Sequence, residues 1–478
     1  MARKRRYLPP LEVEITGLGP KGLGRAETEH GEILVRGAAP GSRVLVTPFK
    51  KKKGTWHARK TATIRPAPNG AKPRCAQFGL CGGCTLQELS ESGQRVAKGS
   101  HAIDEFALGA GVPVEGVHAA IKVHSPRSTG QAYGYRNKVE LTFGVSRFLS
   151  ESDHAEGQAI DGRFLGFHAP GRFDRVVDAP RCELISEALN GVLAVVRAAV
   201  LVDDLPPNYN PRTHEGFWRH LILREGITTG EILVGLVVAS HPEEQQHIAR
   251  IAAALEPHME TVGGPVVGLV VLKNDGVADV ARGDVLALFG RPYFYDALNG
   301  VRFKLSLSSF FQTNTTGASL LYDTIGEALG EARRQLFDLY CGAGSIGLYL
   351  ADRFDQIVGV ELVEAAVLDA RANAQRNGVK NARYVAADMS QALEIIEDKG
   401  GARAIVVDPP RVGLHPKVAA ALATATADVL VYVACKPRSL GRDASILAQE
   451  GWVMTDLWPV DMFPQTGHVE LVARFVRP

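Results

Sequence analysis

A cysteine near the C-terminus stands where a chain could use a thiol as a nucleophile. Cys435 closes an apolar run, VLVYVAC, and Pro437 follows it between Lys436 and Arg438. Such a run predicts a buried strand, and strand ends are where α/β proteins place ligand-binding groups. Nearby positive charge lowers the pKa of a thiol and raises its thiolate fraction. The alternative interpretation is an inert buried cysteine, which is common for this residue type.

A second group of residues could bind a nucleotide-like cofactor. LFDLYCGAGSIGLYLA (336–351) predicts a strand, a glycine turn and a helix start, where Gly342 and Gly344 let the backbone approach a ligand. Glu361 closes the next apolar run, where a carboxylate could bind both hydroxyls of a ribose. Asp388 closes the third run, placed to meet an adenine amino group. A third glycine completes Gly-x-Gly-x-x-Gly, so spacing alone also allows NAD.

The loop after the fourth apolar run decides between these cofactors. IVVDPPRVG (405–413) places Asp408 at the end of a strand, and two prolines then stiffen the loop. Asp-Pro-Pro at this position looks like the substrate-side loop of S-adenosylmethionine-dependent methyltransferases that act on nucleobases. The sequence therefore favours S-adenosylmethionine over a dinucleotide.

A carboxylate farther along the chain could serve as the base that such chemistry needs. Uracil C5 becomes nucleophilic only after a thiolate adds at C6, and a base must then remove the C5 proton so that the thiolate can leave. MFPQTGHVELV (462–472) supplies Glu470, with His468 as the rival base. Glu470 is the preferred base, and Cys435 would be its partner.

Three other cysteines are spaced as metal ligands. Cys75-x5-Cys81-x2-Cys84 is a close set, and the chain has six cysteines in all. Six in 478 residues make no disulfide framework. We therefore expect a metal or cluster site in a reducing compartment.

The elements that must position the thiol and the glycine turn form an alternating pattern from residue 316 onward. The strand-like runs are QLFDLY, QIVGVE, ARYVAAD, RAIVVDPP and VLVYVAC. Amphipathic stretches such as LVEAAVLDARANAQRNG (362–378) lie between them and predict helices. Strands alternating with helices predict a parallel, doubly wound sheet.

The rest of the chain is rich in predicted strands. Short alternating runs in residues 11–64 predict a small β-barrel with Lys50 to Lys53 at a loop tip, and a helix is expected from Leu86 to about Gly109. Longer runs up to about residue 300 predict a mixed, mostly antiparallel sheet. The predicted domains are 1–64, 65–110, 111–305 and 306–478.

Composition and charge point to a cytoplasmic protein with a polyanionic partner. Hydrophobic residues make up 45% and charged residues 22% of the chain, as in ordinary globular proteins. No apolar run is long enough for a spanning helix, and the basic N-terminus lacks the apolar block of a signal peptide. Residues 1–60 carry 14 Lys and Arg against 5 Asp and Glu. A basic block of this kind suits nucleic acid, although a solvated tail is the alternative.

Taken together, these motifs resemble the RNA uracil-5-methyltransferase family. SFFQTN (309–314), DLYCGAGSIGL, VGVE, DPPRVG, YVACKP with LGRD, and FPQTGHVE stand in the order found in that family. Residues 7–64 look like its TRAM domain, a small RNA-binding β-barrel. Cys75, Cys81 and Cys84, with Cys182 in VDAPRCEL, resemble its [4Fe–4S] site. The similarity covers nearly the whole chain and is greatest to enzymes that carry both modules and methylate 23S ribosomal RNA.

The resemblance implies a Rossmann-like class I methyltransferase domain, S-adenosylmethionine as methyl donor and RNA as substrate. Cys435 would be the nucleophile and Glu470 the base. The side chains expected to line the cofactor are Gln312, Tyr340, Ser345, Glu361, Asp388 and Asp408. Gln312 and Asp408 would also face the uracil edge.

The resemblance further implies that the cysteines hold a [4Fe–4S] cluster, with tetrahedral zinc as the alternative. The ligands would be Cys75, Cys81, Cys84 and Cys182, whereas Cys341 would be structural. Two departures from the family pattern are Lys436, where many relatives have Asn, and the long gap before Cys182. The protein is expected to act as a monomer, without a membrane partner.

Three other functions stay open at this point. The same chemistry on transfer RNA is the nearest alternative. Methylation of a nucleobase amino group also uses Asp-Pro-Pro, but it needs neither Cys435 nor Glu470. A non-catalytic RNA-binding protein is the third. In each case the basic N-terminal module would contact phosphates, and Tyr135, Arg136 and Lys138 are predicted to stack on or contact RNA.

Overall fold

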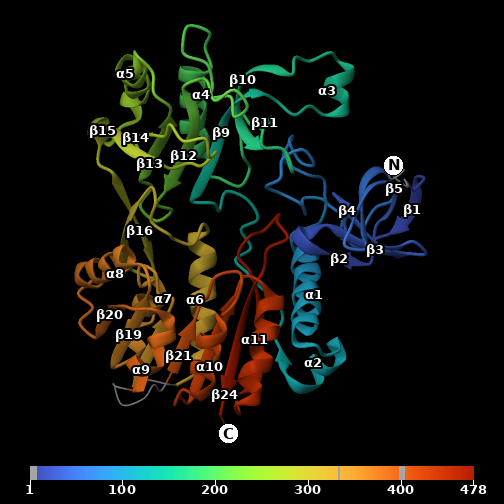
Figure 1. Ribbon diagram of the computed structural model, residues 1–478, viewed down its shortest axis with the longest axis vertical. Coiled ribbons are helices and arrows are strands. Elements are labelled where there is room, and N and C mark those ends of the chain that lie inside the picture. Colours follow the sequence, from blue (N-terminus) through green and yellow to red (C-terminus); the bar gives the residue numbers. More distant parts are fainter. Residues whose placement is uncertain (1–7, 332–333, 398–403, 478) are drawn as a thin grey trace.

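The computed structural model describes residues 8–331, 334–397 and 404–477. Its described strands form three large sheets and one two-stranded ribbon. Figure 1 shows an N-terminal body at the right, a central body at the top and a C-terminal body at the bottom. The basic residues 3–6 and Arg403, at the start of one predicted strand, lie outside the described residues. In the described part of the chain, no helix has the length and apolar character needed to cross a bilayer.

The N-terminal body is a six-stranded sheet around a small apolar core. Its strands are β1 (Leu11–Glu14), β2 (Gly17–Leu18), β3 (Gly24–Thr28), β4 (Gly31–Arg36), β5 (Arg43–Lys52) and β6 (Thr55–Arg65). They are ordered β1-β5-β6-β4-β3-β2, and β4 pairs with β6 in parallel. The predicted loop tip at Lys50 to Lys53 is wrong, because the pairing of β5 with β6 continues to Lys52 and only Lys53 and Gly54 form the turn.

The segment from residue 91 to residue 128 packs on the C-terminal body. It contains α1 (Glu91–Ala110), α2 (Val114–Ala120), β7 (Lys122–Val123) and β8 (Arg127–Ser128). The Ser90 hydroxyl accepts a hydrogen bond from the N–H of Gly93 and caps α1, so the helix begins at Glu91 rather than at the predicted Leu86. The predicted domain boundary at residue 110 therefore falls inside this unit.

The central body is a seven-stranded sheet covered by helices. Its strands are β9 (Lys138–Ser146), β10 (Asp161–His168), β11 (Val176–Asp178), β12 (Trp218–Glu225), β13 (Ile232–Val238), β14 (Val266–Lys273) and β15 (Asp284–Gly290). Its helices are α3 (Glu151–Ala155), α4 (Glu187–Val200) and α5 (Glu244–Leu255), and the apolar faces of α4 and α5 share one core with the sheet. The order is β11-β10-β9-β12-β13-β14-β15, with β13 and β14 parallel and the other pairs antiparallel. This confirms the predicted mixed, mostly antiparallel sheet.

A ribbon and a helix connect the central body to the C-terminal body. The ribbon consists of β16 (Tyr293–Leu298) and β17 (Val301–Ser306), which pair antiparallel, and α6 (Thr315–Leu329) follows it. The inner face of the ribbon buries Phe294, Phe303 and Leu305 in the same core as α6. The apolar runs of the sequence do not predict this ribbon.

The C-terminal body is a doubly wound sheet. Its strands are β18 (Gln335–Leu339), β19 (Gln356–Glu361), β20 (Ala382–Ala386), β21 (Ala404–Val407), β22 (Val429–Ala434), β23 (Val453–Asp461) and β24 (Glu470–Val476). Its helices are α7 (Ser345–Tyr349), α8 (Glu364–Arg376), α9 (Ala392–Glu397), α10 (Pro416–Thr424) and α11 (Pro437–Gln449). The order is β20-β19-β18-β21-β22-β24-β23-β7, and β8 also pairs with β23.

The apolar runs of the sequence predict only some of the strand directions in this sheet. The five predicted strands, β18 to β22, are parallel as expected. The last two strands form an antiparallel hairpin that returns along β22, and β7 and β8 extend the far edge. Thus a segment near residue 125 completes a sheet whose other strands begin after residue 330.

Candidate active site

The parallel strands bring most of the predicted catalytic and cofactor residues to one edge of the C-terminal sheet. These residues follow or close successive strands, namely Tyr340 after β18, Glu361 at the end of β19, Asp388 beyond β20, Asp408 after β21 and Cys435 after β22. Open α/β sheets bind their ligands at this edge. The site therefore collects residues that are far apart in the sequence.

Strand pairing sets the Cys435 thiol beside the Glu470 carboxyl. β22 and β24 are antiparallel neighbours in which Ala434 lies opposite Leu471, so the next step along the pair sets Cys435 opposite Glu470. The two groups are close enough for the Glu470 carboxylate to raise the pKa of the thiol. The predicted nucleophile and the predicted base thus face the same space.

The thiol lies in an environment different from the one its sequence neighbours suggest. Burial, followed by the Glu470 carboxylate, raises the pKa of Cys435 to about 11. The cation that acts in the opposite direction is Arg411, through its charge and a hydrogen bond to the sulfur. Lys436 and Arg438 are exposed at the first turn of α11 and do not contribute. The expectation that these two cations lower the thiol pKa is therefore wrong, because burial and Glu470 raise it and Arg411 is the cation that opposes them.

The proposed base shares a buried acidic pair with a second carboxyl. Glu470 is only 5% exposed. Burial first, and then the charge of Asp408, raises the pKa of Glu470 to about 8, while Arg411 and Lys98 lower it. Burial also raises the pKa of Asp408 to about 7. The carboxyls of Glu470 and Asp408 therefore gain and lose their protons near neutral pH.

The rival base lies at the rim of the pocket. His468 is exposed, and its Nδ1 lies 3.0 Å from a guanidinium nitrogen of Arg411. Partial burial and then the Arg411 charge lower the pKa of His468 to about 4. A nitrogen that already accepts from Arg411 is a poor acceptor for a substrate proton, so the geometry favours Glu470.

The glycine turn of the cofactor half is fixed by two carboxylates. The Glu361 carboxylate accepts hydrogen bonds from the N–H of Gly342, at 3.1 Å, and of Val363, at 2.9 Å. The buried Asp338 carboxylate accepts one from the N–H of Gly347 at 3.0 Å. Gly342 has a φ of 54°, and a Cβ placed on it would have no neighbour within 4 Å. One side of the turn is therefore open to a ligand.

The other predicted cofactor residues surround this turn. Tyr340 is half-buried with a φ of 62°, a left-handed conformation that non-glycine residues rarely adopt. Ser345 begins α7 and its hydroxyl lies 2.9 Å from the Tyr322 hydroxyl. Asp388 is exposed at the sheet edge. Gln312 lies in the loop between β17 and α6, where its carbonyl accepts a hydrogen bond from the Asn137 amide at 2.8 Å.

The loop that leads to Glu470 is held by residues that sequence reasoning missed. Lys98 of α1 forms a buried ion pair of 2.5 Å with Asp461 and donates a hydrogen bond to the Phe463 carbonyl at 3.1 Å. The side chain of Gln94 donates to the Gln465 side chain at 3.0 Å and accepts from its backbone N–H at 2.7 Å. These partners are separated by more than 360 residues, so no local sequence pattern predicts their contacts. The sequence could have indicated Arg411 as a site residue, because it lies in the DPPRVG motif with Asp408.

The four predicted ligand cysteines line one pocket. Cys75, Cys81 and Cys84 belong to the irregular segment before α1, and Cys182 reaches the same pocket from the loop before α4. The pKa of Cys81 is raised to about 11 and that of Cys84 to about 12, first by burial and in part by the other thiolates. The thiols are therefore close to one another.

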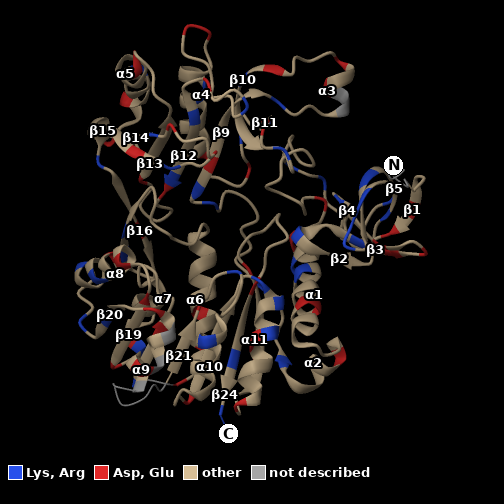
Figure 2. Cartoon of the chain, in the orientation of Figure 1, with Lys and Arg blue, Asp and Glu red and all other residues tan. Residues whose placement is uncertain are grey.

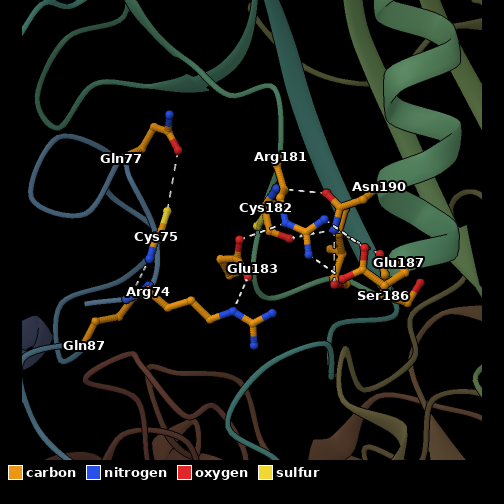
Figure 3. Close-up of polar contacts among 11 residues, drawn as sticks. Arg74, Cys75, Gln77, Gln87, Arg181, Cys182, Glu183, Ser186, Glu187 and Asn190 are labelled. Carbon is orange, nitrogen blue, oxygen red and sulfur yellow. Dashed lines mark hydrogen bonds and ion pairs between the residues drawn. The ribbon is translucent and has the colours of Figure 1, made fainter. Parts of the chain in front are cut away.

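Polar contacts join the two cysteine segments, as Figure 3 shows. Arg74 forms an ion pair of 2.7 Å with Glu183, and the Cys75 N–H donates to the Gln87 side chain at 3.0 Å. The Asn190 amide bonds both the N–H and the carbonyl of Cys182, each at 3.0 Å. Across the described residues, no three His, Cys, Asp or Glu side chains are already close enough to hold a single metal ion.

The remaining cysteine and the predicted RNA contacts of the central segment are buried or paired. Cys341 is 5% exposed, and burial raises its pKa far above the ordinary value. Tyr135 is 1% exposed and its hydroxyl donates to the Pro464 carbonyl at 2.8 Å, so the prediction that it stacks on RNA is wrong. Arg136 lines the cysteine pocket, and Lys138 pairs with Glu140 at 2.7 Å.

Comparison with known proteins connects this geometry to a family. The family model described as tRNA (Uracil-5-)-methyltransferase matches residues 284–475. A protein of Caldanaerobacter subterraneus subsp. tengcongensis is 34% identical over 97% of each chain, and one of Chlorobaculum tepidum is 35% identical over 98% of this chain and 96% of its own. Both are named uncharacterized RNA methyltransferases.

The chain belongs to the RNA uracil-5-methyltransferase family. It is an S-adenosylmethionine-dependent enzyme that modifies RNA. Its fold agrees with that of the Pyrococcus abyssi tRNA (uracil-54, C5)-methyltransferase solved with S-adenosyl-L-homocysteine, with a TM-score of 0.72 and 24% identity over 98% of this chain and all of that one. The predicted class I methyltransferase fold is thereby confirmed.

Proposed function

We propose that this methyltransferase forms 5-methyluridine in 23S ribosomal RNA by covalent catalysis through Cys435, with transfer RNA as the alternative substrate. The observation that carries the covalent mechanism is the thiol of Cys435 beside the carboxyl of Glu470 across two strands. Methylation of an amino nitrogen needs neither group, so this pairing argues against that alternative. Free thiols and an RNA substrate both suit the reducing cytoplasm.

The Cys435 sulfur adds to C6 of the uracil and makes C5 electron-rich. S-Adenosylmethionine, when bound, supplies a methyl group on a positively charged sulfur, which C5 can attack. Glu470 then removes the proton from C5, and the C6–sulfur bond breaks to regenerate the thiol. Arg411 favours the charged forms of both catalytic groups because it lowers the pKa of each.

The residues at the glycine turn fit the cofactor. The open side of Gly342 leaves room for a ligand, and Glu361 beside it offers a carboxylate to ribose hydroxyls. Asp388 would meet the adenine amino group, while Tyr340 and Ser345 would contact the rest of the cofactor. The charge of Asp408 acts on both Cys435 and Glu470, and Asp408 and Gln312 would hold the uracil edge.

The cysteine pocket fits a [4Fe–4S] cluster better than a single ion. Four thiols line it and compete electrostatically with one another, which a cationic cluster would relieve. The thiols of a four-iron cluster bind different irons and therefore stand farther apart than the ligands of one zinc ion. Arg136, with a buried Nε that has no hydrogen-bond partner among the described residues, would face the ligating sulfurs.

The N-terminal sheet supports an RNA substrate. We propose β1 to β6 as a TRAM module, on which Lys50, Lys51 and Lys52 are exposed on β5 and Phe49 is 55% exposed next to them. Figure 2 shows basic residues along this strand. Basic and aromatic side chains on one sheet suit contacts with phosphates and bases.

RNA that carries 5-fluorouridine tests the covalent mechanism. The fluorine cannot be removed as a proton, so methylation should stop with the RNA bonded to Cys435. We expect a stable protein–RNA adduct on a denaturing gel, none with Cys435→Ala, and accumulation with unmodified uridine in Glu470→Gln. Release of tritium from 5-tritiated uridine should fall by at least about a hundredfold in either variant.

Transcripts of 23S ribosomal RNA and of transfer RNA distinguish the substrates in the same assay. Tritium release from the ribosomal transcript alone would support the proposal, and release from transfer RNA alone would replace it with the alternative. An adduct that forms equally well with Cys435→Ala would contradict the mechanism.

A further inference from the structure

The ribbon that joins the central and C-terminal bodies carries tyrosines and cations on its outer face. We call this the basic face. It consists of Tyr293 and Tyr295 of β16 and Arg302 and Lys304 of β17, with Arg291 and Arg376 at its edges. Side chains alternate along each strand, so the apolar residues between these positions point into the core.

Each tyrosine ring of the basic face is covered by cations. The Arg302 guanidinium lies 3.9 Å from the centre of the Tyr295 ring, and the Lys304 ammonium lies 4.0 Å from that of Tyr293. Arg291 is within 5.7 Å of both rings, and Arg376 of α8 is 5.6 Å from Tyr295. A guanidinium stacked on a ring keeps its N–H groups at the edge free for other acceptors.

The charge of the basic face is only partly neutralised by the protein. Arg291 pairs with Glu231 and Glu260, each at 3.0 Å. Within the described part of the chain, Arg302, Lys304 and Arg376 form no ion pair with a carboxylate. Figure 2 shows Lys and Arg on α8, next to the ribbon. A carboxyl that senses these cations is that of Asp369, on which the charges of Lys304 and Arg376 act. Three cations close to one carboxyl leave a net positive charge, which favours an anionic partner.

The basic face continues into the loop that carries Gln312. β17 ends at Ser306, and the buried Arg224 fixes the following turn by donating to the carbonyls of Ser306, at 2.5 Å, and Ser309, at 2.7 Å. Phe310, the next residue, is 76% exposed. This fixed turn and the exposed Phe310 therefore connect the basic face to Gln312 within one short loop.

We propose that the basic face binds the RNA strand beside the target uridine, with Arg302 and Lys304 contacting its phosphates and the tyrosines holding these cations in place. The proposal rests on the RNA substrate of the proposed function. Single-stranded RNA is the occupant that the observations favour, because its charge complements the face and RNA-modifying proteins generally target unstacked loops. The tyrosines are positioning residues, since cations cover their rings.

Binding of a labelled single-stranded oligouridine, measured by fluorescence anisotropy over a range of salt concentrations, tests the proposal. Arg302→Ala/Lys304→Ala should weaken binding about tenfold and lower the slope of log affinity against log salt by about 0.7 for each cation removed. The matched control is Lys380→Ala/Arg383→Ala, which removes two exposed cations near the start of β20, at the opposite end from Asp388. This control should bind as the wild type does.

Substitutions of Tyr295 test the positioning role without a change of charge. Tyr295→Phe keeps the ring under Arg302 and should bind within about twofold of the wild type. Tyr295→Leu should weaken binding while the salt slope stays the same, because the cations remain but are no longer held. If the Arg302 and Lys304 double variant matches its control in affinity and slope, the basic face does not bind RNA.

The methyl-transfer assay separates this inference from the function on which it depends. The double variant should raise KM for RNA far more than it changes kcat. If the wild type forms no 5-fluorouridine adduct, the covalent mechanism is wrong. The anisotropy measurement would still show whether the basic face binds RNA. A double variant that binds normally yet loses kcat would overturn the binding role.

Discussion

At the scale of single residues, Arg411 is the cation that acts on both catalytic groups. Glu470, Asp408 and Cys435 are brought together by three strands, and their burial raises the pKa of each. Arg411 lowers the pKa of both Glu470 and Cys435. The charged forms needed for catalysis therefore depend on this side chain rather than on the cations that follow the thiol in the sequence.

The rate of tritium release should rise with pH through about 8, the value to which burial raises the pKa of Glu470, and continue to rise toward about 11, the value to which burial raises the pKa of Cys435. Both groups act only when deprotonated, so the rate should fall about tenfold for each pH unit between these values and more steeply below about 8. Arg411→Gln should move this rise to higher pH, because losing the cation raises the pKa of both catalytic groups.

Lys436→Gln is the matched control for this pH profile. Lys436 is exposed and does not contribute to the thiol pKa, so its profile should match that of the wild type. Equal shifts in both variants would show that the sequence neighbours of Cys435 do set its pKa.

At the scale of elements, the catalytic loop is supported by a helix from a distant part of the chain. α1 contributes Lys98, which holds Asp461 at the end of β23, and Gln94, which holds Gln465 on the loop before Glu470. The backbone N–H of Thr85 also donates to the Gln465 carbonyl at 2.8 Å, which ties the loop to the segment of the cysteines. The position of Glu470 thus depends on elements outside the doubly wound sheet.

Lys98→Met should destabilise the protein by about 3–5 kcal/mol, because it leaves the 2%-exposed Asp461 carboxylate buried without a counter-charge. Denaturant unfolding followed by tryptophan fluorescence measures this cost. Lys98→Met/Asp461→Leu should recover much of the lost stability.

A surface pair on the same helix gives the control for the buried one. Arg25 and Asp104 of α1 form an ion pair of 3.2 Å with both side chains 35% exposed. Arg25→Met should change stability by no more than about 1 kcal/mol. If the two Met variants lose equal stability, the buried pair has no special role in holding the loop.

Local sequence signals predicted the strands of the C-terminal sheet and the residues at their ends. Apolar runs identify β18 to β22, and the residue that follows each run lies at the ligand edge by the geometry of parallel sheets. The same signals missed β7 and β8, which are two residues long and pair with a strand more than 300 residues away. They missed Lys98 for the same reason, since its partners are set by tertiary packing alone.

At the scale of the whole molecule, the cysteine pocket joins an irregular segment near the N-terminal sheet to the central body. Residues 66–90 contain almost no regular structure and lie between the N-terminal sheet and α1. Cys182 belongs to the central body, and its meeting with Cys75, Cys81 and Cys84 closes a loop of about a hundred residues. A group that binds all four sulfurs would therefore fix residues 66–90 against the central body.

Cys182→Ser should abolish metal binding and release residues 66–90, because a three-thiol pocket no longer links this segment to the central body. Iron and zinc content and the visible absorption of anaerobically purified protein report the first effect. Limited proteolysis reports the second, with cleavage in residues 66–90 becoming severalfold faster.

Cys341→Ser is the matched control. Cys341 is buried in the glycine turn and does not line this pocket, so the substitution should change neither readout. Full metal content in the Cys182 variant would mean that three thiols suffice. In that case the central body would have to be held by direct contacts such as the Arg74–Glu183 ion pair.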